Sequence, residues 1–174
     1  LILIGLVGLF APQLAPYGYD EINLIAISQS PSVDHPFGTD QLGRDYLSRV
    51  MFGIRTSLWV AVMVAVLATL IGTAIGALAG YFGGTLDNLL MRFTDLMLTL
   101  PILAVLLTAS VYFGAGDPFK TGLILAFLLW TAIARIVRGL FLSLREKEFV
   151  EAAKASGAGN SRIILRHILP NCVG

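Results

Sequence analysis

The strongest constraint on the fold is one long apolar run without charge. The segment "SLWVAVMVAVLATLIGTAIGALAGYF", residues 57–82, contains no Asp, Glu, Lys, Arg or His. About 20 apolar residues suffice for a helix to cross the hydrocarbon core of a bilayer. A helix also satisfies its backbone hydrogen bonds internally, as lipid requires. The sequence therefore predicts a transmembrane helix over 57–82.

Two more apolar segments have the length of a span, over 89–114 and 121–140. Pro101 lies inside the first of them and predicts a kink there. The run at 1–11 is too short to cross alone, so we expect it to be part of an incomplete first span. The whole chain is 56% hydrophobic and only 13% charged, with a mean hydropathy of +0.81. Together these features predict an all-α, polytopic membrane helix bundle.

The polar segment before the first long span has two parts. Residues 12–38 contain four prolines, which exclude a long helix and predict an irregular loop. From Thr39 onward, apolar residues recur at helical spacing as far as residue 56. Thr39 is a candidate N-cap, and Asp45 and Arg49 are spaced for an i,i+4 ion pair. We expect a separate helix here that lies along the membrane surface, so that 12–56 forms a loop with an interfacial helix.

The distribution of basic residues predicts the orientation. Seven of the 12 Lys and Arg residues fall between 135 and 166, whereas 12–56 holds three of them and five acidic residues. Cytoplasmic loops are enriched in Lys and Arg, which places the later segment in the cytoplasm. Three predicted spans separate the two segments, so 12–56 should lie outside.

A row of glycines runs along the first long span. Gly72, Gly76 and Gly80 recur every four residues and so share one helix face. Small residues let a second helix approach closely in lipid. Two interpretations remain open: packing within this subunit, or packing across a subunit interface.

The second span begins with two opposite charges. Arg92 and Asp95 are three residues apart and can pair on one face. They lie about one turn from the expected membrane boundary, where an arginine side chain can reach the interface. The pair is either a boundary ion pair or a substrate contact, and the sequence leaves both open.

Several functions find no support in the sequence. One cysteine, Cys172, excludes an internal disulfide and a cysteine-based metal cluster, and His35 and His167 lie far apart. There is no GxxxxGK[ST] phosphate-binding loop, so we do not expect this chain to hydrolyse ATP. A net charge of +1 does not favour nucleic acid as a partner. A secondary transporter or channel remains an alternative, although such proteins often carry mid-span acidic residues that are absent from these runs.

The segment 141–170 is basic and polar and follows the last span directly. It predicts a short helix that ends at Gly157 and a second helix that is capped by Asn160 or Ser161 and bounded by Pro170. Small side chains along the first helix suit insertion into a groove of another protein. An amphipathic connector between spans would explain the same residues equally well.

A resemblance favours the first interpretation. Glu151-Ala152-Ala153, then three residues, Gly157, and later Leu169-Pro170 resemble the EAA signature of permease subunits of binding-protein-dependent ABC importers. His167 departs from that pattern, which usually has isoleucine there. "RHILPN", "HPFGTDQLGRDYLSRVMFGIRTSL" and "DNLLMRFTDLMLTLP" are similar to the dipeptide, oligopeptide and nickel branch, in particular to its second permease. The likeness runs from about residue 35 to 171.

The resemblance implies a fold, a mechanism and a set of partners. The fold would be the type I permease fold, with 57–174 as its transmembrane domain and the last two of about six spans missing after residue 171. Segment 141–170 would dock on cytoplasmic ATPase subunits as a coupling helix. The positions carried over for that role are Glu151, Ala152, Ala153, Gly157, Leu169 and Pro170.

The resemblance further implies a transport subunit of the bacterial cytoplasmic membrane rather than an enzyme. The partners would be a second permease, two ATPase subunits that use ATP, an extracytoplasmic solute-binding protein and the bilayer. No cofactor is expected on this chain. The branch favours peptides as the solute, with a nickel complex or glutathione as open alternatives.

Overall fold

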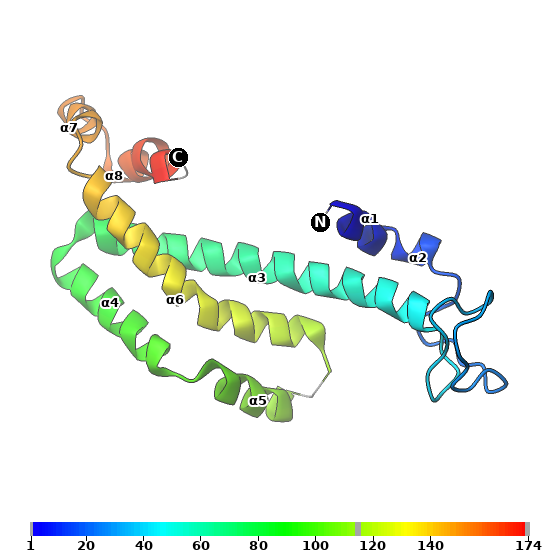
Figure 1. Ribbon diagram of the computed structural model, residues 1–174. Coiled ribbons are helices and arrows are strands. Elements are labelled where there is room, and N and C mark those ends of the chain that lie inside the picture. Colours follow the sequence, from blue (N-terminus) through cyan, green and yellow to red (C-terminus); the bar gives the residue numbers. More distant parts are fainter. Residues whose placement is uncertain (1, 114–115, 173–174) are drawn as a thin grey trace. The chain divides into compact units, whose positions relative to one another are not determined.

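The computed structural model describes residues 2–113 and 116–172. The chain divides into two compact units, Leu1–Val62 and Met63–Gly174, and each is described by itself. Figure 1 labels the helices along the chain. Throughout the described residues the secondary structure is helical, apart from one isolated bridge between Thr39 and Asp45. The all-α fold class is confirmed.

The first unit contains two short helices, a long loop and the beginning of a third helix. Helix α1 spans Ile2–Leu9 and α2 spans Ala11–Leu14. Gly8 packs closely on the third helix, since a Cβ there would lie 2.8 Å from the side chains of Ile54 and Leu58. The loop between α2 and residue 46 is irregular, as its prolines predicted.

Helix α3 spans Tyr46–Phe82 without interruption. The prediction of a separate helix that begins at Thr39 and ends before the span is therefore wrong. Thr39 lies in the loop, where its hydroxyl donates to the Ala26 carbonyl oxygen and accepts from the Gln29 N–H at 2.9 Å. Asp45 caps the helix instead, since its carboxylate accepts from the Ser48 N–H at 2.7 Å.

The second unit contains the remaining helices. Helix α4 spans Gly84–Thr99, α5 spans Ile102–Phe113 and α6 spans Pro118–Leu144. The chain then forms α7 at Glu148–Ala155 and α8 at Asn160–Arg162. A π-helical turn, η1, follows at Ile163–Ile168 and a 3-10 turn, η2, at Leu169–Cys172. Both α4 and α5 pack against α6.

Two of these helices, α3 and α6, are long and apolar enough to cross a membrane. Helices α4 and α5 pass the same test as a pair and are bent by 77° at the break between them. Leu100 has φ −71° and ψ 126°, the extended backbone that the following Pro101 favours. The kink predicted at Pro101 is confirmed, and the predicted end of that span at residue 114 lies outside the described residues.

Candidate functional site

The candidate site is the segment that carries the signature residues, from the end of α6 to η2. Helix α7 buries Val150 completely and Ala153 to 9% exposure, while Glu151 and Ala152 are exposed between them. In a helix, residues three apart share a face, so α7 has one anchored face and one free face. The free face is short and carries Ala152 and Ala155 together with the charged side chains of Glu151 and Lys154.

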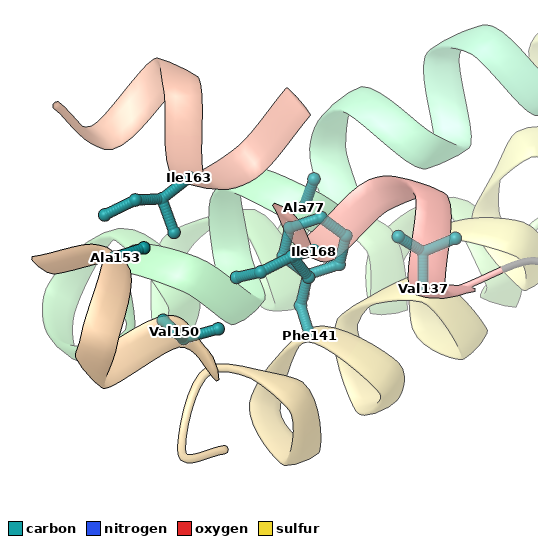
Figure 2. Packing of buried hydrophobic residues seen from close by; sticks show 7 residues of the cluster. All are labelled: Ala77, Val137, Phe141, Val150, Ala153, Ile163 and Ile168. Carbon is teal, nitrogen blue, oxygen red and sulfur yellow. The ribbon is translucent and has the colours of Figure 1, made fainter. Parts of the chain in front are cut away.

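A compact apolar core holds α7 in place. Val150 and Ala153 from α7 pack with Val137 and Phe141 from α6, Ala77 from α3, and Ile163 and Ile168 from η1, as Figure 2 shows. Phe141, Val150 and Ile168 are each 0% exposed. Replacing a buried side chain of this size by alanine costs about 2–5 kcal/mol. We call these seven residues the coupling core; they connect α7 to the ends of α3 and α6, with η1 packed against α7 and η2 against α6.

Gly157 forms the turn after α7. Its φ is +78°, in the left-handed region that side chains with a Cβ rarely adopt, and a Cβ placed there would meet nothing within 4 Å. The Gly157 N–H donates to the Lys154 carbonyl at 2.9 Å, which closes the end of the helix. The predicted helix end at Gly157 is confirmed, and the turn is exposed.

The element after the turn differs from the prediction at its start. Gly159 occupies the N-cap position of α8, and neither Asn160 nor Ser161 caps the helix. The Asn160 side chain accepts instead from the Tyr81 hydroxyl at 2.9 Å, which links α8 to the end of α3. Leu169 and Pro170 lie within η2, and Leu169 packs against the coupling core.

The glycine row faces α6 of the same chain. A Cβ on Gly72 would lie 2.6 Å from the Trp130 carbonyl oxygen, and one on Gly76 would lie 2.5 Å from that of Ala134. At Gly80 the nearest atom is the Phe141 Cβ, at 2.6 Å. Backbone and Cβ atoms cannot move aside, so glycine is required for this contact. Of the two interpretations, the structure supports packing within the chain.

The charged residues of the spans pair between helices rather than along one. Asp95 on α4 bonds Arg135 on α6, not Arg92 one turn away on its own helix. The predicted pair of Arg92 and Asp95 is therefore not formed. A second pair joins Asp87, near the start of α4, to Arg138 through two hydrogen bonds of 2.5 and 2.6 Å. The facing helix supplies an arginine for each aspartate, which local spacing could not predict.

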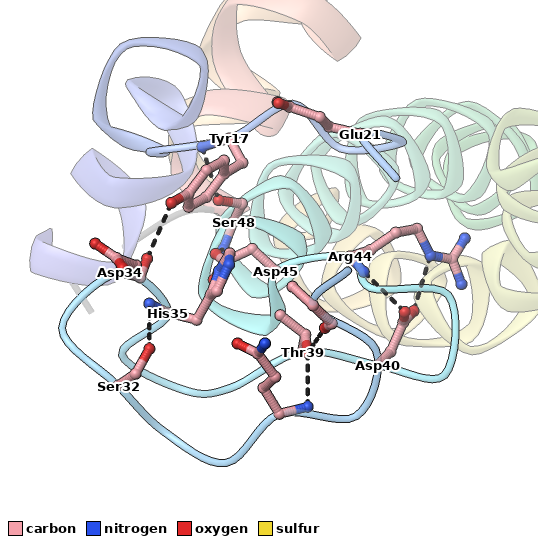
Figure 3. Close-up of polar contacts among 12 residues, drawn as sticks. Tyr17, Glu21, Ser32, Asp34, His35, Thr39, Asp40, Arg44, Asp45 and Ser48 are labelled. Atoms are coloured by element: carbon pink, nitrogen blue, oxygen red, sulfur yellow. Dashed lines mark hydrogen bonds and ion pairs between the residues drawn. The ribbon is translucent and has the colours of Figure 1, made fainter. Parts of the chain in front are cut away.

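Sequence reasoning missed a polar cluster in the loop before α3, shown in Figure 3. His35 and Asp45 are 7% and 3% exposed, and the His35 Nδ1 lies 3.0 Å from an Asp45 oxygen. The His35 ring packs on Tyr17 with centroids 4.8 Å apart, and the Tyr17 N–H donates to the Ser48 hydroxyl at 3.2 Å. We call Tyr17, His35, Asp45 and Ser48 the loop cluster. It joins two distant parts of the loop to the first turn of α3.

The loop cluster also affects the ionisation of Asp45. Burial acts to raise the pKa of this carboxyl, but hydrogen bonds from Ser48 and His35 outweigh burial and leave the pKa below its ordinary value. The predicted ion pair between Asp45 and Arg49 is not formed. Arg49 lies 3.4 Å from Asp40 instead, because Asp45 is occupied as the helix cap.

The predicted site residues thus fall into separate regions of the second unit. Ala153 and Leu169 meet at the coupling core, whereas Glu151, Ala152, Gly157 and Pro170 are exposed. The glycine row lies along the contact of α3 with α6. Across residues 2–113 and 116–172, no group of three or more His, Cys, Asp or Glu could hold a metal ion.

Comparison with known proteins defines the class. The family described as "Binding-protein-dependent transport system inner membrane component" matches residues 72–174, which include α6, the coupling core and the exposed face of α7. The chain belongs to this family. It is a multi-pass inner-membrane protein.

Particular relatives are peptide permeases. The chain is 42% identical over 176 residues to the oligopeptide transport system permease protein OppC of Escherichia coli (strain K12), covering 100% of this chain and 58% of that protein. It is 38% identical over 174 residues to OppC of Bacillus subtilis (strain 168), with 100% and 57% covered. The dipeptide transport system permease protein DppC of the same strain is 39% identical over 177 residues, with 100% and 54% covered. The chain spans little more than half the length of these relatives.

Proposed function

We propose that this chain is one of two permease subunits of an ATP-driven peptide importer, and that α7 is the element through which cytoplasmic ATPase subunits move the spans. The proposal rests chiefly on one observation: α7 leaves Glu151, Ala152 and Gly157 exposed while the coupling core fixes its other face to α3 and α6. A helix that is exposed on one face and packed on the other can transmit the movement of an ATPase subunit to the spans.

This movement would pass to the spans through the contacts of the coupling core. Val150 and Ala153 share the coupling core with Val137 and Phe141 of α6, while η1 packs against α7 and η2 packs against α6. Because packed interiors are dense and deform little, displacement of α7 moves the end of α6 with it. The glycine row keeps α3 in backbone contact with α6, so both helices would shift together. Arg138 extends the connection to α4 through Asp87.

The names of the relatives support peptides as the solute, since OppC and DppC are permeases of oligopeptide and dipeptide transport systems. The proposed partners are a second permease, two ATPase subunits that consume ATP, and an extracytoplasmic solute-binding protein. This chain would bind no cofactor of its own. A nickel complex or glutathione would require the same machinery and a different binding protein.

Uptake into vesicles tests the proposal against a secondary transporter. The whole transporter is reconstituted with its binding protein and a labelled peptide, with the ATPase sites facing an accessible compartment. We expect uptake that requires both ATP and the binding protein and that survives collapse of ion gradients. Uptake that continues without ATP and follows an ion gradient would contradict the proposal.

A further inference from the structure

Two ion pairs join α4 to α6, and they differ in burial. The side chain of Asp87 is 10% exposed and bonds Arg138 through both carboxylate oxygens. Asp95 and Arg135 are 58% and 53% exposed, and they share a single contact between one oxygen and one nitrogen. Neither side chain makes another hydrogen bond to any residue in 2–113 or 116–172. The first pair engages both carboxylate oxygens, whereas the second leaves one carboxylate oxygen and most of the guanidinium donors free.

The exposed pair lies on helices that are apolar enough to cross a membrane. Asp95 follows Gly84 by eleven residues and Arg135 precedes Leu144 by nine, which corresponds to about 16 and 14 Å along the respective helices. A charged side chain at the centre of a span costs about 2.5–3.5 kcal/mol when it faces lipid. Charges in spans therefore face water-filled cavities or other protein groups, and they often mark the path of a solute.

A small cavity lies at the break between α4 and α5, about one helical turn along from the pair, and neither charge lines it. Its volume is about 100 Å³, and its lining includes Leu98, Leu128, Thr131 and Ala132. Leu98 follows Asp95 by three residues, while Ala132 and Thr131 precede Arg135 by three and four. Residues at these spacings share a helix face, so the cavity and the two charges belong to the same surface. The combination is an apolar recess with a carboxylate and a guanidinium about one helical turn away.

We propose that Asp95 and Arg135 form a contact site for the charged ends of the transported peptide, with Arg135 binding its carboxylate and Asp95 its ammonium group. This inference rests on the proposed function, since it assigns the solute a place on this chain. Guanidinium binds carboxylate with high geometric complementarity, and the recess accommodates part of an apolar side chain. Because the two charges neutralise each other when no peptide is bound, the site does not leave a bare charge in the span.

End-blocked peptides test the assignment of each charge. Uptake of a free peptide, its N-acetylated form and its C-amidated form is measured for Arg135→Gln and Asp95→Asn in the whole transporter. Each rate is divided by the wild-type rate for the same peptide. We expect Arg135→Gln to slow free peptide about tenfold and to affect the amide much less. Asp95→Asn should slow the free peptide to a similar extent and affect the N-acetylated peptide much less.

The buried pair supplies matched controls. Arg138→Gln and Asp87→Asn remove the same charges from the same two helices, and we expect them to slow all three peptides by equal factors. If Arg135→Gln and Asp95→Asn also slow all three equally, the exposed pair is only structural and the inference is wrong. Normal peptide uptake by the wild type in that experiment would leave the proposed function intact, whereas failure of the wild type to import any peptide would overturn both.

Labelling by a charged, membrane-impermeant thiol reagent gives a second measurement that does not require transport of blocked peptides. Asp95→Cys is compared with Thr131→Cys, which is 2% exposed, in a chain where Cys172 is replaced by serine. We expect rapid labelling at 95, slowed by transportable peptide, and none at 131. Absence of labelling at 95 would show that lipid or protein covers the site and would overturn the inference.

Discussion

At the contact of α3 with α6, we expect replacement of glycine by alanine to destabilise the protein, although helix propensity alone favours alanine. Alanine is a better helix former than glycine by about 1 kcal/mol. At Gly76, however, the new Cβ would lie 2.5 Å from the Ala134 carbonyl oxygen, 2.9 Å from the Val137 Cβ and 3.0 Å from the Arg138 nitrogen. None of these atoms is the end of a flexible side chain, so the two helices must separate.

Gly139 on α6 provides the control, because a Cβ there would meet nothing within 4 Å. The propensity gain is similar at both positions, and overpacking typically costs about 1–3 kcal/mol. We therefore expect Gly76→Ala to have a free energy of unfolding about 1–3 kcal/mol lower than that of Gly139→Ala. The difference between the two variants isolates the packing cost.

Unfolding in mixed micelles by a denaturing detergent measures this difference. The fluorescence of Trp130 reports on the contact, since this side chain is 2% exposed and stacks on Phe93. Equal stability of Gly76→Ala and Gly139→Ala would refute the assignment of the glycine row to close packing with α6.

Ala74, rather than Ala77, is the matched position for a leucine substitution at Gly76. From helical rotation alone, Ala77 is turned away from the glycine face, and Ala77→Leu would serve as a mild comparison for Gly76→Leu. In the structure Ala77 is 5% exposed and belongs to the coupling core. Ala74 is exposed, so Ala74→Leu is the proper comparison.

Further predictions concern other regions. Gly157→Trp should insert normally but abolish ATP-driven uptake. Gly157→Asn should retain most of the uptake, because asparagine tolerates a positive φ. Normal uptake by the tryptophan variant would refute docking at this turn. A cysteine at Ser30 should react with an impermeant thiol reagent outside intact cells and one at Lys154 should not, and reversed labelling would overturn the orientation. Asp45→Asn should retain the helix cap, whereas Asp45→Ala should lose it. Loss of the cap alone should lower the free energy of unfolding by about 1 kcal/mol. The pKa of Asp45 is lowered in the folded chain, so its contribution to stability is present above the ordinary carboxyl pKa and is lost as pH falls through the lowered value. Limited proteolysis of the loop should therefore accelerate only below about pH 4.

Features that depend on local chemistry could be predicted from the sequence. The apolar runs correspond to α3, to α6 and to the broken pair α4 and α5. Pro101 produces the break because it lacks an N–H and restricts the residue before it. Gly157 ends α7 because its positive φ suits glycine. Each of these follows from a few neighbouring residues.

Features that depend on tertiary contacts could not be predicted. Asp95 had a suitable arginine three residues away, yet it bonds Arg135, forty residues later. His35 and Asp45 lie ten residues apart in a loop, where no periodicity indicates that they meet. The partner of the glycine row was open because spacing shows that a face is small but not which helix covers it.

The central claim, that α7 is the contact with the ATPase subunits, is tested most directly by cross-linking at two adjacent alanines. Ala152 is exposed and Ala153 is 9% exposed, so cysteines at these positions differ in accessibility but not in the helix that carries them. In the whole transporter, with Cys172 replaced by serine and a short bifunctional reagent added, we expect Ala152→Cys to cross-link to an ATPase subunit and Ala153→Cys to remain free. Failure of Ala152→Cys to cross-link to the ATPase in a transporter that still imports peptide would contradict the account.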